Sequence, residues 1–181
     1  MKVIELILER RMASLYHWMS VPKAESVFDE DAFNQTWKHQ TKEGEFDGIS
    51  LSRNDKFTYG GKAVRLTLDQ GALASRYKIL PLDAERAFHY SIETPAWDRM
   101  KDRRINSRHA QQYAEEFVVG KIKHLHKYIT HIEISKYVRS SPGIFVNAAK
   151  KYADLWGLKL TIDPELQKRI KDDERRVEDD E

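Results

Sequence analysis

Apolar and polar residues alternate over several short runs of the chain. Residues 63–68 alternate strictly, as the side chains of a half-buried strand do, and residues 14–18 are rich in types that favour β structure. Runs of the same kind predict further short strands at residues 49–53, 77–80, 117–119, 129–134 and 158–162. Between residues 29 and 47, and again between 83 and 106, no period is sustained, so we expect irregular structure there.

Helices are predicted where capping residues precede an apolar period. Ser20 and Pro22 begin one helix, and Asp69 caps a short one that ends near Leu73. Other helices are expected over residues 2–12 and from residue 163 onward. The charged end of that last helix, residues 171–181, is expected to fray.

A longer helix is predicted from residue 142 to Trp156, and Gly157 ends it. Its apolar residues Ile144, Ala148, Tyr152 and Leu155 fall on one side at helical spacing, so this side is expected to face the core.

Short strands without a regular strand–helix alternation indicate an α+β fold rather than a doubly wound one. We expect a mostly antiparallel sheet of about five to seven strands, split into two packed parts, with helices on the outside. The length of 181 residues suits one core, which we assign to residues 1–170, followed by the charged tail of residues 171–181.

Composition narrows the classes of function. The chain has no cysteine, which excludes disulfides, thiolate nucleophiles and cysteine-ligated zinc and fits a reducing compartment. No apolar run reaches the roughly 18 residues that a membrane span needs, and the start of the chain lacks the features of a signal peptide. We therefore expect a cytoplasmic protein with no membrane partner.

The formal net charge is only +2, but residues 99–127 hold a basic surplus: Arg99, Lys101, Arg103, Arg104, Arg108, Lys121, Lys123 and Lys127. This basic region either binds phosphates of a nucleic acid or another anionic partner, or is a solvated connection. Metal binding is not expected. His124, His126 and His131 lie close together in the sequence, yet no partner stands at a recognised ligand spacing.

Three segments carry the main chemical signal. The first is Leu15-Tyr16-His17 at a strand end, followed by a helix. The second is Gly48-Ile49-Ser50-Leu51-Ser52-Arg53. The third is Tyr113-Ala114-Glu115-Glu116-Phe117-Val118-Val119, with another strand at residues 129–134. In this order the segments resemble ADP-ribosyltransferases, especially the DarT-type toxins that modify DNA. Residues 48–134 are also similar to uncharacterised bacteriophage proteins.

The resemblance implies an ADP-ribosyltransferase-like fold and NAD as cofactor. It implies that Glu116 is the catalytic carboxylate and that His17 binds ribose hydroxyls. Tyr16, Ser50, Ser52 and Arg53 would complete the cofactor site, with Arg53 pairing with the pyrophosphate. Glu115 competes with Glu116 for the catalytic role. The acceptor would be a nucleic acid or a host protein, reached through the basic region 99–127. Ala114 stands where arginine-modifying members carry a second glutamate, which disfavours arginine as acceptor.

Each of these residues also has an ordinary structural interpretation. His17 fits a hydrogen-bonded core histidine, Glu116 a carboxylate paired with a lysine, and the two serines a polar strand face. Two other functions therefore stay open. One is a non-catalytic viral binding or structural protein with a related fold. The other is a different nucleic-acid enzyme, such as a nuclease or a relative of RNA 2′-phosphotransferases, for which Arg53, Arg65 and Arg76 are available.

Overall fold

The computed structural model describes residues 14–34, 36–41, 44–52, 55, 62–81 and 115–179. The predicted helix over residues 2–12 and the aperiodic segment 83–106 lie outside these ranges. The elements are, in order, β1 (Ser14–Met19), α2 (Val21–Glu30), β2 (Ala32–Phe33), β3 (Trp37–Thr41), β4 (Gly44–Ser52), β5 (Val64–Asp69), α3 (Gln70–Ala74), β6 (Ile79–Pro81), β7 (Glu115–Val119), β8 (Ile122–Lys123), the 3-10 turn η1 (Leu125–Lys127), β9 (Ile129–Ile134), α7 (Pro142–Trp156), β10 (Lys159–Ile162) and α8 (Pro164–Asp179).

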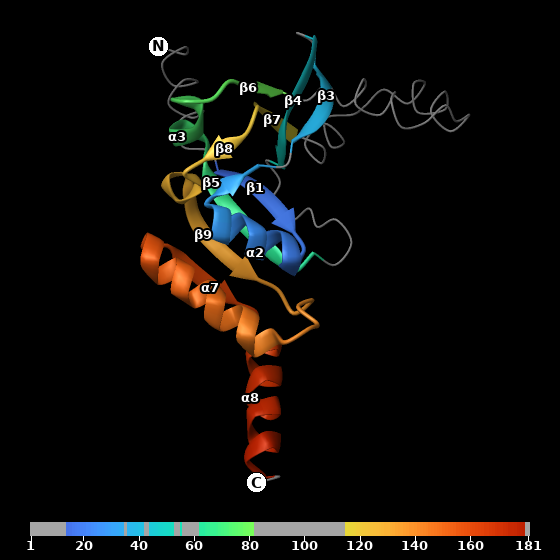
Figure 1. Cartoon of the computed structure of the whole chain (residues 1–181), viewed down its shortest axis with the longest axis vertical. Coiled ribbons are helices and arrows are strands. Elements are labelled where there is room, and N and C mark those ends of the chain that lie inside the picture. Colours follow the sequence, from blue (N-terminus) through green and yellow to red (C-terminus); the bar gives the residue numbers. More distant parts are fainter. Residues whose placement is uncertain are drawn as a thin grey trace, which may run out of the picture.

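An eight-stranded sheet organises the molecule (Figure 1). Its strand order is β10-β9-β5-β1-β4-β7-β6, and β3 pairs with β4 beside this path. Among the described strands, β9 and β10 pair in parallel and the other pairs are antiparallel. The predicted α+β class and the mostly antiparallel sheet are thus confirmed, with more strands than expected. The predicted division into two packed parts stays a prediction.

One face of the sheet forms the core. On β1, Leu15 and Met19 are buried, and they pair with Leu68 and Val64 of β5, which are buried as well. His17 lies between Leu15 and Met19 on the same strand and pairs with the buried Leu66. Because side chains two residues apart share a face, His17 belongs to this core face.

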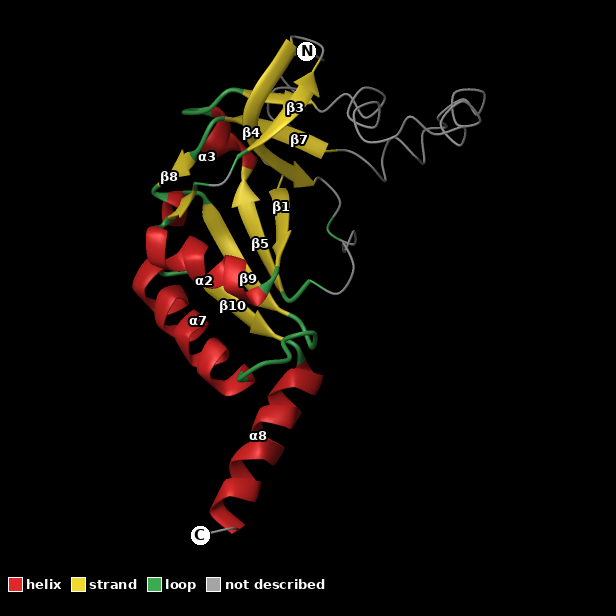
Figure 2. Ribbon diagram, turned by 45° about the vertical axis from the view of Figure 1, so that its right-hand side comes forward, coloured by secondary structure: helices red, strands yellow, loops and turns green. Residues whose placement is uncertain are grey.

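Helices α2 and α7 cover the core face side by side, as Figure 2 shows. Their contact is aromatic: the Phe28 ring of α2 lies 5.5 Å from Tyr152 and 5.9 Å from Trp156 of α7, between centroids. The helix ends follow the predicted signals, since Pro22 and Pro142 occupy first-turn positions and Gly157 adopts a left-handed conformation at φ 65°.

The inward side of α7 differs from the predicted one. The buried residues of this helix are Phe145, Val146, Ala149 and Ala153. Ile144 and Leu155 are instead 73% and 69% exposed. The sequence offers two apolar sides on this helix, and the small residues Ala149 and Ala153 let the backbone approach the sheet more closely than Ile144 and Leu155 would.

The opposite face of the sheet is polar and aromatic. Arg65 of β5 lies between the rings of Tyr16 and Trp18 on β1, with its guanidinium carbon 5.2 and 5.1 Å from their centroids. Its nitrogens also bind the carboxylate of Glu133 on β9. We call this surface, defined by Tyr16, Trp18, Arg65 and Glu133, the polar face.

Strand β3 and the first part of β4 were expected to be irregular, and that expectation is wrong. They pair as an antiparallel hairpin from Trp37↔Gly48 to Thr41↔Gly44. The sequence of this hairpin is mostly polar apart from Trp37 and Phe46, so no apolar alternation marks its strands. Strand β4 continues beyond the hairpin, and its residues from Gly48 to Ser52 pair with β7, so the hairpin extends a strand that is anchored in the main sheet.

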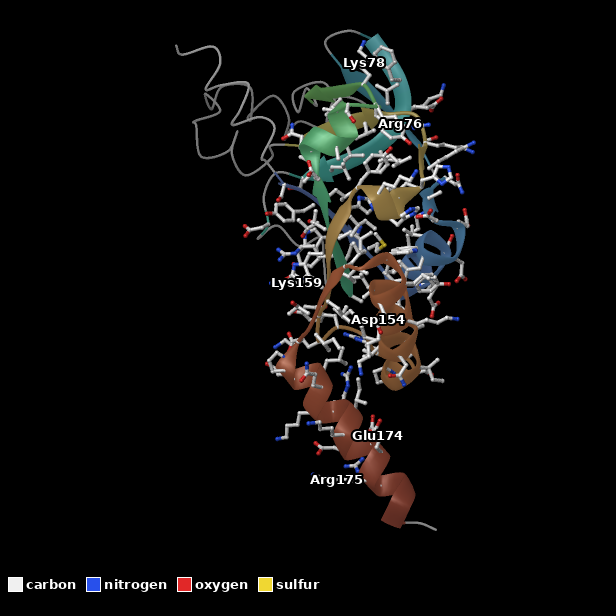
Figure 3. All side chains as sticks on the ribbon, turned by 90° about the vertical axis from the view of Figure 1, so that its left-hand side faces the viewer. Arg76, Lys78, Asp154, Lys159, Glu174 and Arg175 are labelled. Atoms are coloured by element: carbon white, nitrogen blue, oxygen red, sulfur yellow. The ribbon has the colours of Figure 1, made fainter. Side chains whose placement is uncertain are left out.

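Helix α8 projects from the sheet and its covering helices (Figure 1). Leu166 is buried at its beginning, whereas residues 171–176 are all exposed. Figure 3 labels Glu174 and Arg175 on this part, where both side chains point into solvent. The helix continues to Asp179, across the predicted boundary at residue 170. Within the described ranges, no helix is long and apolar enough to cross a membrane.

Candidate ligand site on strands β1, β4 and β7

Every described residue of the predicted site lies on three consecutive strands of the sheet. His17 and Tyr16 are on β1, Ser50 and Ser52 on β4, and Glu116 on β7. In the strand order, β4 lies between β1 and β7. Segments that are far apart along the chain are thus brought together at the middle of the sheet.

His17 is held in one orientation by a strand neighbour and a ring contact. Its Nδ1 lies 3.1 Å from the backbone carbonyl oxygen of Ser50, which can only accept a hydrogen bond. The proton is therefore on Nδ1, and Nε2 carries a lone pair. The imidazole also lies 4.7 Å from the ring of the buried Phe33, between centroids. In the described part of the chain, Nε2 has no hydrogen-bond partner.

Burial lowers the pKa of His17 to about 4, and the positive charges of Lys62 and Lys23 lower it further, against the opposing effect of the Ser50 hydrogen bond. The ring is therefore neutral at physiological pH. A neutral imidazole with Nδ1–H already donated can accept a hydrogen bond at Nε2. Ribose hydroxyls are donors of the required kind.

The register of the strands relates His17 to Glu116. Tyr16 pairs with Ser52, and continuing this antiparallel register by one residue puts His17 opposite Leu51. Leu51 in turn pairs with Glu116 of β7. The prediction that His17 and Glu116 lie on neighbouring strands is wrong, because β4 separates them. Two inter-strand spacings amount to about 10 Å between the backbones.

The other predicted residues belong to the polar face. Tyr16 alternates with His17 on β1, and Ser52 pairs with Tyr16. Ser50 shares this face with Ser52 by the same alternation. The geometry thus divides the predicted cofactor residues between two faces of one sheet. The carbonyl of Ser50 still contributes to the His17 side through the main chain.

Glu115 and Arg53 complete the set of predicted residues. Glu115 takes the register position opposite Ser52, in the row of Tyr16. Glu116 pairs with Leu51 instead, so the two glutamates take different register positions along β4. Arg53 lies outside the described residues, as does the part of the basic region from residue 99 to 114. In the remaining part, Lys121, Lys123 and Lys127 are exposed.

Sequence reasoning missed three residues around His17. Phe33 of β2 packs on the imidazole. Lys23 and Lys62 act on the ring through their charge. For Lys23 the sequence contained one indication. A lysine in the first turn of a helix is unfavourable next to the positive end of the helix dipole, so its position there was unusual. The other two had none, because their approach depends on tertiary structure.

His124 and His126 both approach the carboxylate of Asp31, which ends α2. Asp31 Oδ2 lies 2.6 Å from His126 Nδ1, and Asp31 Oδ1 accepts the backbone N–H of His126 at 2.8 Å. His124 Nδ1 is 3.9 Å from the same carboxylate. His131 instead contacts Thr161 on the sheet. Within the residues that the structure describes, no group of three or more such side chains is arranged to hold a metal ion.

Comparisons with known proteins do not name a family. The chain matches no protein-family model, and no curated protein matches it.

Proposed function

We propose that this chain is an NAD-dependent mono-ADP-ribosyltransferase, with His17 as a ribose ligand and Glu116 as the catalytic carboxylate. The observation that carries the proposal is the His17 imidazole, which is neutral and fixed through Nδ1 to the main chain of β4. Its Nε2 has the acceptor character that a ribose hydroxyl requires. The acceptor is a nucleic acid or a protein of a bacterial host, and the activity belongs in the host cytoplasm.

The spacing of the strands supports a ligand that spans them. A dinucleotide whose one ribose is bound at His17 extends across β4 before its reactive ribose meets Glu116 on β7. Two inter-strand spacings separate the backbones of His17 and Glu116 by about 10 Å, so a ligand that reaches both residues must extend past Leu51, which pairs with Glu116 on β4.

The proposed reaction breaks the bond between ribose C1′ and the nicotinamide nitrogen. Nicotinamide leaves with the bonding electron pair, and positive charge develops on the ribose. The Glu116 carboxylate stabilises this charge electrostatically. The acceptor then forms its bond to C1′, and its proton passes to Glu116 or to water. NAD and acceptor are thereby converted to ADP-ribosyl acceptor, nicotinamide and a proton.

The test measures nicotinamide release and labelled ADP-ribose transfer with single-stranded DNA, RNA and a bacterial lysate as acceptors. Glu116→Gln should lose transfer by about 10² to 10³ in rate while still binding NAD, because one electrostatic partner of the transition state is gone. Glu115→Gln is the matched control. It changes the neighbouring residue in the same chemical way, and it should change the rate much less.

His17 gives a second, different readout. His17→Gln should weaken NAD binding, because a ribose contact acts in the ground state as well as in the transition state. Melting curves must show that each variant folds. If Glu116→Gln transfers at the parental rate, or if the parent consumes no NAD with any of these acceptors, the transferase is rejected. The non-catalytic binding protein then becomes the better description.

A further inference from the structure

Helix α8 continues well beyond the last side chain that packs on the domain. Leu166 is buried at its beginning and Ile170 packs partly against the core, whereas residues 171–176 are all exposed. The helix nevertheless extends to Asp179. Isolated helices of fewer than about 12 residues are marginal in water, because nucleation is costly and no tertiary packing compensates for it. The projecting end therefore needs stabilising interactions that the core does not supply.

Charges of alternating sign follow one side of α8. We call this side the charged stripe, and it consists of Lys168, Asp172, Arg175 and Asp179. Spacings of four, three and four residues place these positions in one row along a helix. At about 3.6 residues per turn, the row lies on the opposite side of the helix from the buried Leu166. The charged stripe is thus on the side that does not pack on the domain.

The charges of the stripe have no partner among the side chains that the structure describes. Lys168, Asp172 and Arg175 are exposed, and within the described part of the chain they make no ion pair or hydrogen bond. Figure 3 shows Arg175 pointing into solvent. The described ion pair of α8 lies in its first turn, where Lys136 Nζ is 3.0 Å from Glu165 Oε1. The charged stripe is therefore available to a second molecule.

Reversing the direction of the stripe exchanges the sign at every position. The order along the helix is plus, minus, plus, minus, so a copy that runs in the opposite direction presents minus, plus, minus, plus. Two antiparallel copies therefore place Lys168 opposite Asp179 of the second copy, and Asp172 opposite Arg175 of the second copy. Two-fold symmetry produces each of these pairs twice. A parallel copy in the same register would instead oppose like charges.

We propose that two copies of this chain associate through the charged stripes of their α8 helices, in antiparallel orientation. The inference goes beyond the proposed function and does not depend on it. Helix α8 projects from one end of the molecule, whereas β6 and β7 lie at the other end, so the pairing leaves the candidate ligand site uncovered (Figure 1).

The association is weak and sensitive to salt, because the ion pairs are exposed. Four pairs of this kind correspond to a dissociation constant on the order of 1 mM at low ionic strength. The chain is therefore a monomer at micromolar concentration. Screening at about 1 M salt reduces the range of the charges to about 3 Å and should abolish the association.

The experiment measures the self-association of the full chain by sedimentation at low salt, over concentrations up to about 1 mM. Lys168→Glu replaces two attractive contacts of the dimer by two repulsive ones and should weaken association about tenfold or more. Lys168→Glu/Asp179→Lys exchanges the two charges within one chain and should restore the parental association. The two positions are about 16 Å apart along one helix, too far to pair with each other, so the rescue requires a contact between copies.

The matched control is Lys168→Glu/Asp154→Lys. It has the same net charge as the rescued variant, but Asp154 is an exposed residue of α7 (Figure 3), so this variant should associate as weakly as Lys168→Glu alone. Rescue by Asp179→Lys and not by Asp154→Lys supports the antiparallel pairing. A parent that stays monomeric over the whole range overturns the inference. So does a Lys168→Glu variant that associates like the parent, or equal rescue by both second changes, since net charge alone would then explain the effect.

Discussion

The Nδ1 atom of His17 lies 3.1 Å from the backbone carbonyl oxygen of Ser50, so a side chain of β1 is bonded to the main chain of β4. Because the acceptor is a peptide oxygen, the serine side chain is not needed for this bond. The orientation of the imidazole depends instead on the pairing of the two strands. Ser50→Ala should therefore leave the bond in place.

The unfolding free energy should fall as the pH decreases from about 6.5 to about 4. An unfolded histidine titrates near 6.5, whereas folded His17 has a pKa of about 4. The unfolded chain therefore binds more protons in this window, and protonation favours it, by up to about 3 kcal/mol. Denaturant unfolding at several pH values should show the slope. His17→Gln does not titrate, and an equal slope in this variant would contradict the assignment.

Arg65 and Glu133 should be energetically coupled. The side chains are 16% and 26% exposed, and Arg65 also contacts two aromatic rings. A double-mutant cycle with Arg65→Ala and Glu133→Ala should give a coupling of about 1–2 kcal/mol, because either single change leaves a partly buried group without its partner.

The pair Lys136–Glu165 is the control for this cycle. It is exposed at 44% and 71%, so water screens it and its coupling should be much smaller. Arg65→Lys should restore only part of the stability, since an ammonium group lacks the flat surface that stacks between Tyr16 and Trp18. Equal coupling energies in the two pairs would show that burial does not determine the strength of the Arg65–Glu133 pair.

Asp31 should tolerate asparagine better than alanine. The residue ends α2 in a left-handed conformation at φ 48°, and its carboxylate accepts the N–H of His126. Asparagine adopts this conformation readily and keeps one acceptor oxygen, whereas alanine does neither. Asp31→Ala should cost about 2–3 kcal/mol in unfolding free energy, and Asp31→Asn about 1 kcal/mol or less. Chemical denaturation of the two variants decides the matter, and equal losses would refute this explanation.

Removal of residues 171–181 should leave the domain folded. Residues 171–176 are exposed, so their deletion uncovers no core side chain. The melting temperature should therefore change by only a few degrees, as it does for substitutions at the surface. Leu166→Ala is the contrasting variant. Leu166 is fully buried, and its truncation should cost about 2–4 kcal/mol. A large loss on deletion would mean that the projecting part of α8 has a partner.

Local signals predicted the elements whose ends are encoded in a few residues. Asp69 accepts a hydrogen bond from the N–H of Ala72, as its capping role requires. Gly157 ends α7 where expected. The β3–β4 hairpin escaped prediction because its strands lack alternation. The inward side of α7 escaped because the choice between two apolar sides is made by packing against the sheet.

The residues of the candidate site stay a prediction, and their arrangement in the sheet could not be predicted from the sequence. Nothing in the local sequence says that β4 separates β1 from β7, because strand order is decided by pairings over long sequence distances. The division of His17 and Tyr16 between two faces follows directly from strand alternation. The approach of Lys62 to Trp18 needs the folded sheet.

The parallel pairing of β9 with β10 bears on how the chain folds. The unit β9–α7–β10 is contained in residues 129–162, whereas the β4–β7 pairing must close over the whole segment between residues 52 and 115. Loop closure costs more entropy as the enclosed segment lengthens. Nucleation is therefore favoured at the C-terminal unit, and the β4–β7 edge joins late. His17 and Glu116 consequently come together only near the end of folding. The candidate site therefore forms only when the sheet is completely assembled.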